Sequence, residues 1–154
     1  MNRNELFVRI ILLSLTKAGY YDISVEGISM FPSILNNDKV KIQRFDTYKV
    51  NDIILFSYKN SIRLHRILKI ENNTYFCKGD NSFLLEDIHH EQIIGKAIVN
   101  YNRPLLYFNE TLNVLSLEVA KKFKAFKYNI EKTKQDAIYK EYLIQIEKEY
   151  RSNQ

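Results

Sequence analysis

Cysteine, glycine and proline are scarce in this sequence: its 154 residues include one cysteine, four glycines and two prolines. The single cysteine, Cys77, excludes an internal disulfide, so cysteine usage leaves the redox compartment open. A chain of this length folds as one domain, or as one domain with an appendage. It buries enough apolar surface to need neither a disulfide nor a metal for stability.

Long hydrophobic runs are also absent. The apolar stretch Leu6–Leu15 contains Arg9 and is far shorter than the roughly 20 residues of a membrane-spanning helix. The segment Thr16–Tyr20 that follows it offers only a poor signal-peptide cleavage site. We therefore predict no transmembrane span and a protein that is cytoplasmic or peripheral to the membrane.

A strong excess of charge is missing as well. The net charge of +5 is modest, which fits a solvated surface and gives no reason to expect nucleic acid as a partner. Of the three histidines, His89 and His90 are adjacent and would face opposite sides of a strand, and no cysteine or suitably spaced histidine completes a metal site. We assign both to a loop and expect neither a metal nor a cofactor.

The remaining residues divide the chain into three regions and predict a mainly β fold with helical ends. Residues 1–20 predict an amphipathic helix that ends at Gly19 and packs on its own domain through Leu6, Ile10 and Leu13; lying on a membrane is the alternative. Residues 21–108 contain short runs rich in Ile, Val, Phe and Tyr, which predict a curled or barrel-like β-sheet. The expected strands are Asp22–Glu26, Lys39–Gln43, Asp52–Tyr58, Ile62–Glu71, Thr74–Lys78 and Ile94–Tyr101.

The third region, residues 109–154, has neither glycine nor proline after Glu110 and predicts one broken helix or two consecutive helices. Its lysines make this tail basic, which permits contact with an acidic partner protein or a lipid surface, although a solvated face is the simpler interpretation. Its apolar positions are Leu112, Leu115, Val119, Phe123 and Phe126, followed by Ile138, Tyr142 and Ile146.

Ser29 is the main candidate for chemistry. A hydroxyl becomes nucleophilic only when a neighbouring base takes its proton, and an exposed turn must present it to a carbonyl group. Gly27 lets a bound peptide backbone come close, and Pro32 stiffens the exit from the turn. We expect these two residues and Met30 to bind substrate, and the Ser29 N–H to be an oxyanion donor. Taken alone, the segment is equally consistent with a surface turn that carries an incidental serine.

His65 is the candidate base. It lies in a strand-like run in which alternation places His65 and Ile67 on one face, and an imidazole can accept a proton near neutral pH. A carboxylate would fix the tautomer of this imidazole and stabilise its cation. The candidates are Asp80, Glu86 and Asp87, and Asp80 is equally consistent with a turn residue that caps backbone amides.

In their order along the chain, these segments resemble the signal peptidase I family of serine peptidases, which shares its β-fold with the self-cleaving repressor peptidases. The nucleophile segment is similar to the family's glycine-x-serine-methionine-x-proline box. The histidine segment is similar to the branch of the endoplasmic reticulum, archaea and some Gram-positive bacteria, in which histidine replaces the lysine base. Asparagine replaces glycine in both glycine-aspartate strand starts. The matching segments are Gly27–Ile34, Asn37–Val40, Asn51–Phe56, His65–Ile67, Lys78–Asn81 and Ile93–Ala97.

The resemblance implies a serine endopeptidase in which Ser29 is the nucleophile and His65 the general base. Asp87 best matches the supporting acid, and Asp80 matches an earlier acid of the site. The implied substrate is the leader or signal peptide of a precursor protein, cut after small residues and bound as an added strand at a sheet edge. The family's membrane anchor and the helical tail have no match, so we expect a soluble relative that trims the leader of a specific peptide.

Two alternatives remain. A self-cleaving repressor-type peptidase would use a lysine base and carry a DNA-binding domain before the core. The bond Ala18–Gly19 is of the kind that such proteins cut, but it lies only a short distance before Ser29. A non-catalytic peptide-binding module would keep the fold and recruit a partner through its helical tail.

Overall fold

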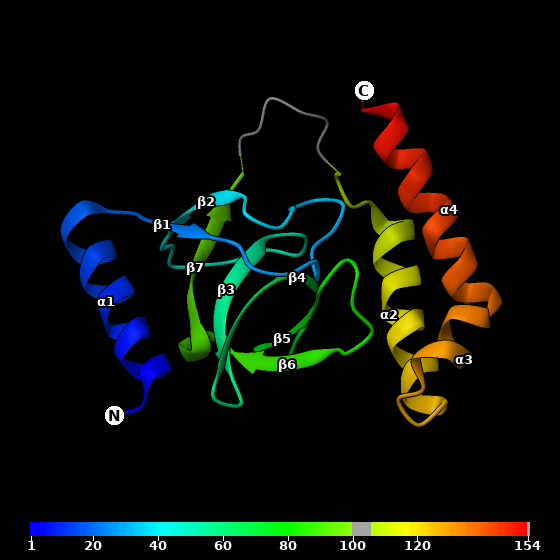
Figure 1. Cartoon of the computed structure of the whole chain (residues 1–154), viewed down its shortest axis with the longest axis horizontal. Coiled ribbons are helices and arrows are strands. Elements are labelled where there is room, and N and C mark those ends of the chain that lie inside the picture. Colours follow the sequence, from blue (N-terminus) through cyan, green and yellow to red (C-terminus); the bar gives the residue numbers. More distant parts are fainter. Residues whose placement is uncertain (100–105, 154) are drawn as a thin grey trace.

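The structure is a computed structural model that describes residues 1–99 and 106–153. Its strands form one antiparallel sheet in the order β1-β2-β7-β3-β4-β5-β6. Helix α1 (Arg3–Ala18) lies on one side of this sheet, and the C-terminal helices lie on the other (Figure 1). The mainly β fold with helical ends is therefore confirmed. The strands are β1 (Tyr21–Ser24), β2 (Lys39–Gln43), β3 (Ile53–Tyr58), β4 (Ser61–Glu71), β5 (Thr74–Lys78), β6 (Glu86–His89) and β7 (Ile93–Ile98).

Asparagine residues form the tight turns of the sheet. Lys59 and Asn60 connect β3 to β4 with φ values of 44° and 62°, and Asn72 and Asn73 connect β4 to β5 with values of 50° and 60°. Two consecutive residues with positive φ match the twist of an antiparallel hairpin. Asparagine tolerates this left-handed region better than most residues, which explains how a chain with few glycines makes these turns.

All six expected strands are present. The predicted strand Ile94–Tyr101 corresponds to β7, which ends at Ile98, and residues 100 and 101 lie outside the described residues. Strand β6 was not expected, and the assignment of its last residue, His89, to a loop is wrong. His90 begins a short 3-10 helix, His90–Gln92. The reason is that β6 contains one apolar residue, so it shows no hydrophobic alternation.

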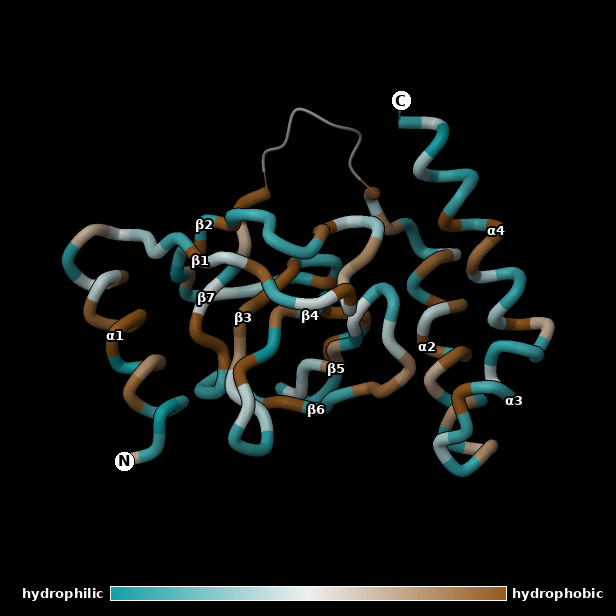
Figure 2. The backbone as a smooth tube through the Cα atoms, in the orientation of Figure 1, coloured by the Kyte–Doolittle hydropathy of each residue, from teal (hydrophilic) through white to brown (hydrophobic). Residues whose placement is uncertain are grey.

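Helix α1 begins with a capping box at Asn2 and ends at Gly19, whose φ is 82°. Its orientation differs from the prediction. The expected contact face, Leu6, Ile10 and Leu13, is exposed, whereas Ile11 and Leu15 are buried against the sheet. Hydrophobic residues occur around most of the helix (Figure 2), so the spacing alone did not identify one contact face.

The C-terminal tail contains three helices, which are α2 (Glu110–Ala125), α3 (Ile130–Gln135) and α4 (Ala137–Ser152). The side chain of Asn129 caps the start of α3 and that of Asp136 caps the start of α4. These two caps divide what the sequence predicts as one or two helices. The tail packs against Leu68 of β4 through Leu106, Phe108, Leu112, Val119, Tyr142 and Ile146.

Within residues 1–99 and 106–153, no helix combines the length and the apolar character that a membrane span requires.

Candidate active site

Ser29 lies in the loop between β1 and β2, and its side chain is partly exposed. Gly27 has a φ of 91°, a left-handed conformation that favours glycine, and its N–H donates to Asn36 Oδ1 at 2.8 Å. The side chains of Met30 and Ile34 anchor the loop in the core beneath it. The loop therefore presents the serine hydroxyl from a fixed backbone.

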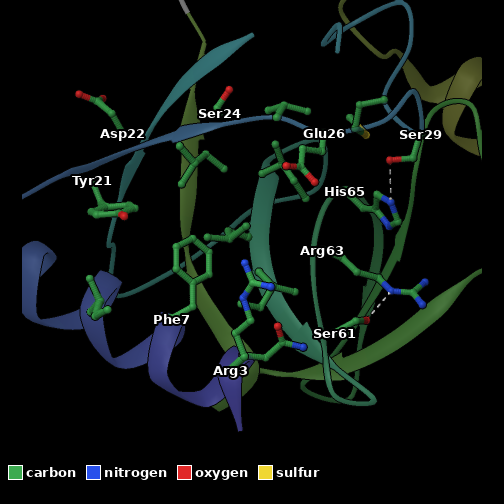
Figure 3. A pocket seen from close by; sticks show the side chains of 18 of the residues that line it. Arg3, Phe7, Tyr21, Asp22, Ser24, Glu26, Ser29, Ser61, Arg63 and His65 are labelled. Atoms are coloured by element: carbon green, nitrogen blue, oxygen red, sulfur yellow. Dashed lines mark hydrogen bonds between the residues drawn. The ribbon is translucent and has the colours of Figure 1, made fainter. Parts of the chain in front are cut away.

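Ser29, His65 and Glu86 form a continuous hydrogen-bonded row. The Oγ atom of Ser29 lies 3.2 Å from Nε2 of His65, a contact drawn in Figure 3. Nδ1 of His65 lies 3.0 Å from Oε2 of Glu86, whose side chain is 1% exposed. NH1 of Arg63 donates to Oε1 of Glu86 at 2.8 Å. A hydroxyl, an imidazole and a carboxylate in this order are the arrangement of a serine hydrolase.

The structure brings together Ser29 and His65, as expected, but places Glu86 rather than Asp87 behind the imidazole. Side chains alternate along β6, so Glu86 and Ile88 face the interior while Asp87 is exposed on the opposite side. The buried Ile88 is the signal that could have identified Glu86, because residues two apart on a strand share a face. Arg63 was not recognised from the sequence as part of the site.

Asp80 is buried, but Arg66 rather than His65 binds its carboxylate. Nε and NH2 of Arg66 donate to its two oxygens at 2.9 and 2.8 Å, and the hydroxyl of Ser33 donates to Oδ2. The expected direct support of His65 by Asp80 is therefore not what the structure shows. Asp80 instead fixes the backbone of the segment that contains it.

That segment, residues 79–82, packs against the back of Ser29. The N–H of Asn81 donates to the carbonyl oxygen of Ser29 at 2.8 Å, and Nδ2 of Asn81 donates to the carbonyl of Ile28 at 3.1 Å. A Cβ atom at Gly79 would lie 2.6 Å from the Ser29 carbonyl oxygen and 3.1 Å from Nε2 of His65. Only glycine permits this close approach.

Two further titratable groups are buried next to the site. Lys78 is fully buried, and burial lowers the pKa of its ammonium group to about 8, although the carboxylates of Asp80 and Glu86 oppose that shift. Burial also raises the pKa of the Cys77 thiol. Within the described part of the chain, no three His, Cys, Asp or Glu side chains are grouped as metal ligands.

An open groove with a volume of about 1130 Å³ leads along the molecule to Ser29 and His65. Figure 3 shows its lining, in which Phe7 and Arg3 of α1 and the side chains of β1 face those of β4. Of the three residues expected to bind substrate, Met30 lines this groove and Gly27 does not. Pro32 borders a separate apolar hollow of about 320 Å³ between the Ser29 loop and α4, lined by Phe31, Leu35, Ile146, Glu147 and Tyr150.

Comparison with known proteins places this site within a recognised sequence family. No curated protein matches the chain. The family model described as Peptidase S24-like matches residues 4–98, a span that includes Ser29, His65 and Glu86 and covers more than half of the chain. The chain therefore belongs to the Peptidase S24-like family.

Proposed function

We propose that this protein is a serine endopeptidase that cleaves an extended leader or signal peptide after a small residue. The proposal rests on the hydrogen-bonded triad of Ser29, His65 and Glu86. In this triad Ser29 Oγ lies 3.2 Å from His65 Nε2, and His65 Nδ1 lies 3.0 Å from Glu86 Oε2. Membership of the Peptidase S24-like family supports serine peptidase chemistry. The closer resemblance to signal peptidase I, and with it the substrate class, rests on the sequence boxes around Ser29 and His65.

Glu86 sets the tautomer of His65. Its carboxylate can only accept hydrogen bonds, so the proton of the neutral imidazole is on Nδ1 and the lone pair is on Nε2. That lone pair points at the hydroxyl of Ser29, and the guanidinium of Arg63 holds the other carboxylate oxygen. The imidazole is thereby oriented as a general base before substrate binds.

Cleavage would then follow two steps. The Oγ atom of Ser29 attacks the scissile carbonyl carbon while His65 Nε2 takes the hydroxyl proton, and we expect the Ser29 N–H to stabilise the oxyanion. His65 returns the proton to the leaving amine, which departs and leaves an acyl group on Ser29. A water molecule, deprotonated by the same Nε2, hydrolyses this ester and restores the serine.

The groove supports an extended peptide as substrate. It is bordered by β1, which forms one edge of the sheet and whose side chains at Asp22 and Ser24 are exposed. A peptide in extended conformation can pair its backbone with such an edge and leave alternate side chains for recognition. The lining of the groove includes apolar residues, among them Met30, Leu55 and Leu64.

The test is cleavage of a library of extended peptides, read by mass spectrometry. Wild-type protein should cleave a subset of them, and Ser29→Ala and His65→Ala should each lower the rate by at least about 10⁴-fold because the triad acts as a unit. Ser152→Ala is the matched control, since this serine is exposed at the end of α4, away from the groove and from the Ser29, His65 and Glu86 contacts, and it should retain activity. Activity that survives Ser29→Ala and His65→Ala would refute the mechanism. Peptide binding without any cleavage would favour the non-catalytic module.

Self-cleavage at Ala18–Gly19 is the second candidate, but the position of this bond disfavours it. Ala18 ends α1, and the Gly19 N–H donates to the carbonyl of Leu15 at 3.1 Å. Neither residue is among those that line the groove, so α1 would have to unwind before this bond reached Ser29. The intact mass of the purified protein would stay constant on storage under the peptidase proposal, whereas loss of the first 18 residues would support self-cleavage.

A further inference from the structure

The C-terminal tail reaches the segment that backs the nucleophile. Tyr142 of α4 is 2% exposed, and its hydroxyl donates to the carbonyl oxygen of Asp80 at 2.6 Å. The next residue, Asn81, donates its N–H to the carbonyl oxygen of Ser29 at 2.8 Å. Two hydrogen bonds on consecutive residues therefore connect α4 to the backbone of Ser29.

Other contacts of the tail act on the same segment. The Nζ atom of Lys78 lies 5.1 Å from the centre of the Tyr142 ring and donates to the carbonyl of Gly79 at 3.0 Å. The ring of Phe108, which precedes α2, lies 4.1 Å from the guanidinium of Arg66. Arg66 in turn holds the Asp80 carboxylate. Asp80 is thus fixed at its carbonyl by α4 and at its carboxylate by a side chain that the tail covers.

Residues 79–82 have little room to move relative to Ser29. Gly79 already packs so closely on the Ser29 carbonyl and on His65 Nε2 that there is no room for one added carbon atom. A shift of the segment would therefore change the positions of both reacting side chains. Displacements of about 1 Å are enough to cost roughly 100-fold in rate.

We propose that Tyr142 is a positioning residue, whose hydroxyl holds residues 79–82 against Ser29 and so makes the helical tail a part of the active-site framework. The catalytic consequence rests on the proposed peptidase function, whereas the structural consequence does not. Burial raises the pKa of the Tyr142 hydroxyl above its usual value, so it retains its proton and remains a donor through the neutral range.

The experiment compares Tyr142→Phe with Tyr139→Phe in the full chain. Both variants keep the aromatic ring and lose one hydroxyl from the same helix, and the Tyr139 ring packs on Phe83 with centroids 5.4 Å apart. Three quantities are measured: the amide hydrogen exchange rate of Asn81, and the kcat and the KM on a peptide from the library. A circular dichroism spectrum and an unfolding curve confirm that each variant is folded.

Tyr142→Phe should raise the exchange rate of the Asn81 amide and lower kcat, each by about fivefold to tenfold, with KM within about twofold of wild type. Tyr139→Phe should leave all three within about twofold. An unchanged exchange rate would overturn the contact as a restraint, and faster exchange with an unchanged kcat would overturn the positioning role. If wild-type protein cleaves no peptide, the proposed function fails, while the exchange rates still decide whether Tyr142 holds the segment.

Discussion

At the scale of single residues, Glu86 is the buried carboxylate on which the orientation of His65 depends. Its carboxylate is almost completely buried and is shared between the imidazole of His65 and the guanidinium of Arg63. Such a group orients the base and stabilises the imidazolium that forms during attack. Asp87, its neighbour in sequence, is exposed on the other face of β6.

The two acids give a matched pair of variants. Glu86→Gln should lower kcat by roughly 10³-fold, because the amide no longer fixes the productive tautomer or stabilises the imidazolium. Asp87→Asn makes the same chemical change one residue away and should stay within about twofold, as is typical of surface positions. Rates of peptide cleavage at neutral pH check both. Equal losses in the two variants would contradict the assignment of Glu86.

Lys78 predicts a pH dependence of stability. Its pKa is about 8 in the folded protein, against 10.5 for a lysine exposed to water. The cost of burying the charge is therefore fully present below pH 8 and disappears as the pH rises from 8 to 10.5. In this window the unfolded chain binds more protons, so this group makes stability rise with pH.

Lys78→Met removes that cost. The variant should be more stable than wild type by about 3 kcal/mol at pH 7, and this difference should shrink steadily between pH 8 and 10.5. Urea unfolding of both proteins at several pH values measures it, and the comparison cancels the contributions of other titrating groups. A difference that does not vary with pH would show that the lysine carries no buried charge.

At the scale of elements, substitution of two glycines should have different effects, one on catalytic activity and the other on stability. A Cβ at Gly79 would collide with the Ser29 carbonyl next to the reacting groups, whereas a Cβ at Gly95 in β7 would meet Ile42 Cγ2 at 2.6 Å and the Gln43 carbonyl oxygen at 2.8 Å. Gly79→Ala should lower kcat by at least about tenfold. Gly95→Ala should instead cost about 1–3 kcal/mol of stability through overpacking, with kcat of the folded fraction near wild type. Parallel unfolding curves and cleavage assays distinguish these outcomes.

Helix α1 carries an exposed face in which apolar and basic residues are mixed. Leu6, Ile10 and Leu13 are exposed there together with Arg9 and Lys17. A face of this composition is typical of helices that lie in the interface of an anionic membrane. We propose this peripheral contact as the role of Leu13, Arg9 and Lys17, because Ile11 and Leu15 pack against the sheet and Leu6 and Ile10 line the groove.

Sedimentation with phosphatidylserine-containing vesicles tests the contact. Leu13→Glu should reduce the bound fraction at least about fivefold, since a charge enters the apolar face. Val114→Glu is the control, because Val114 is also exposed but belongs to α2. If neither change affects binding, or if wild-type protein does not sediment, α1 has no such role.

At the scale of the whole molecule, six of the seven strands in the described residues were readable from the sequence, whereas β6 and the order of the strands in the sheet were not. Short runs rich in Ile, Val, Phe and Tyr predicted these six strands. Asn37 and Asn51, which stand where the resemblance has glycine, adopt φ values of 70° and 77°. The conformation that glycine would provide is therefore retained, and so are the strand starts that follow.

Other features depended on tertiary contacts that a linear pattern does not contain. The predicted contact face of α1 was wrong because hydrophobic residues occur around most of the helix. Identifying Glu86 rather than Asp87 required knowing which face of β6 packs against the interior. The single apolar residue of this strand gives only a weak signal for that face. The role of the tail depended on contacts between Tyr142 and Asp80, 62 residues apart, which no local spacing predicts.

The central claim is that His65 activates the side chain at position 29, and it can be tested without knowing the substrate. In Ser29→Cys, the introduced thiol would lie beside His65 and should react rapidly with iodoacetamide at pH 7, because a nearby imidazole favours the thiolate. The native Cys77 is buried and its pKa is raised, so it should stay unmodified.

The decisive quantity is the alkylation rate at position 29 with and without His65, followed by intact mass. We predict that adding His65→Ala to Ser29→Cys slows the reaction by at least about tenfold. Equal rates in the two proteins would show that His65 does not act on this position and would contradict the account.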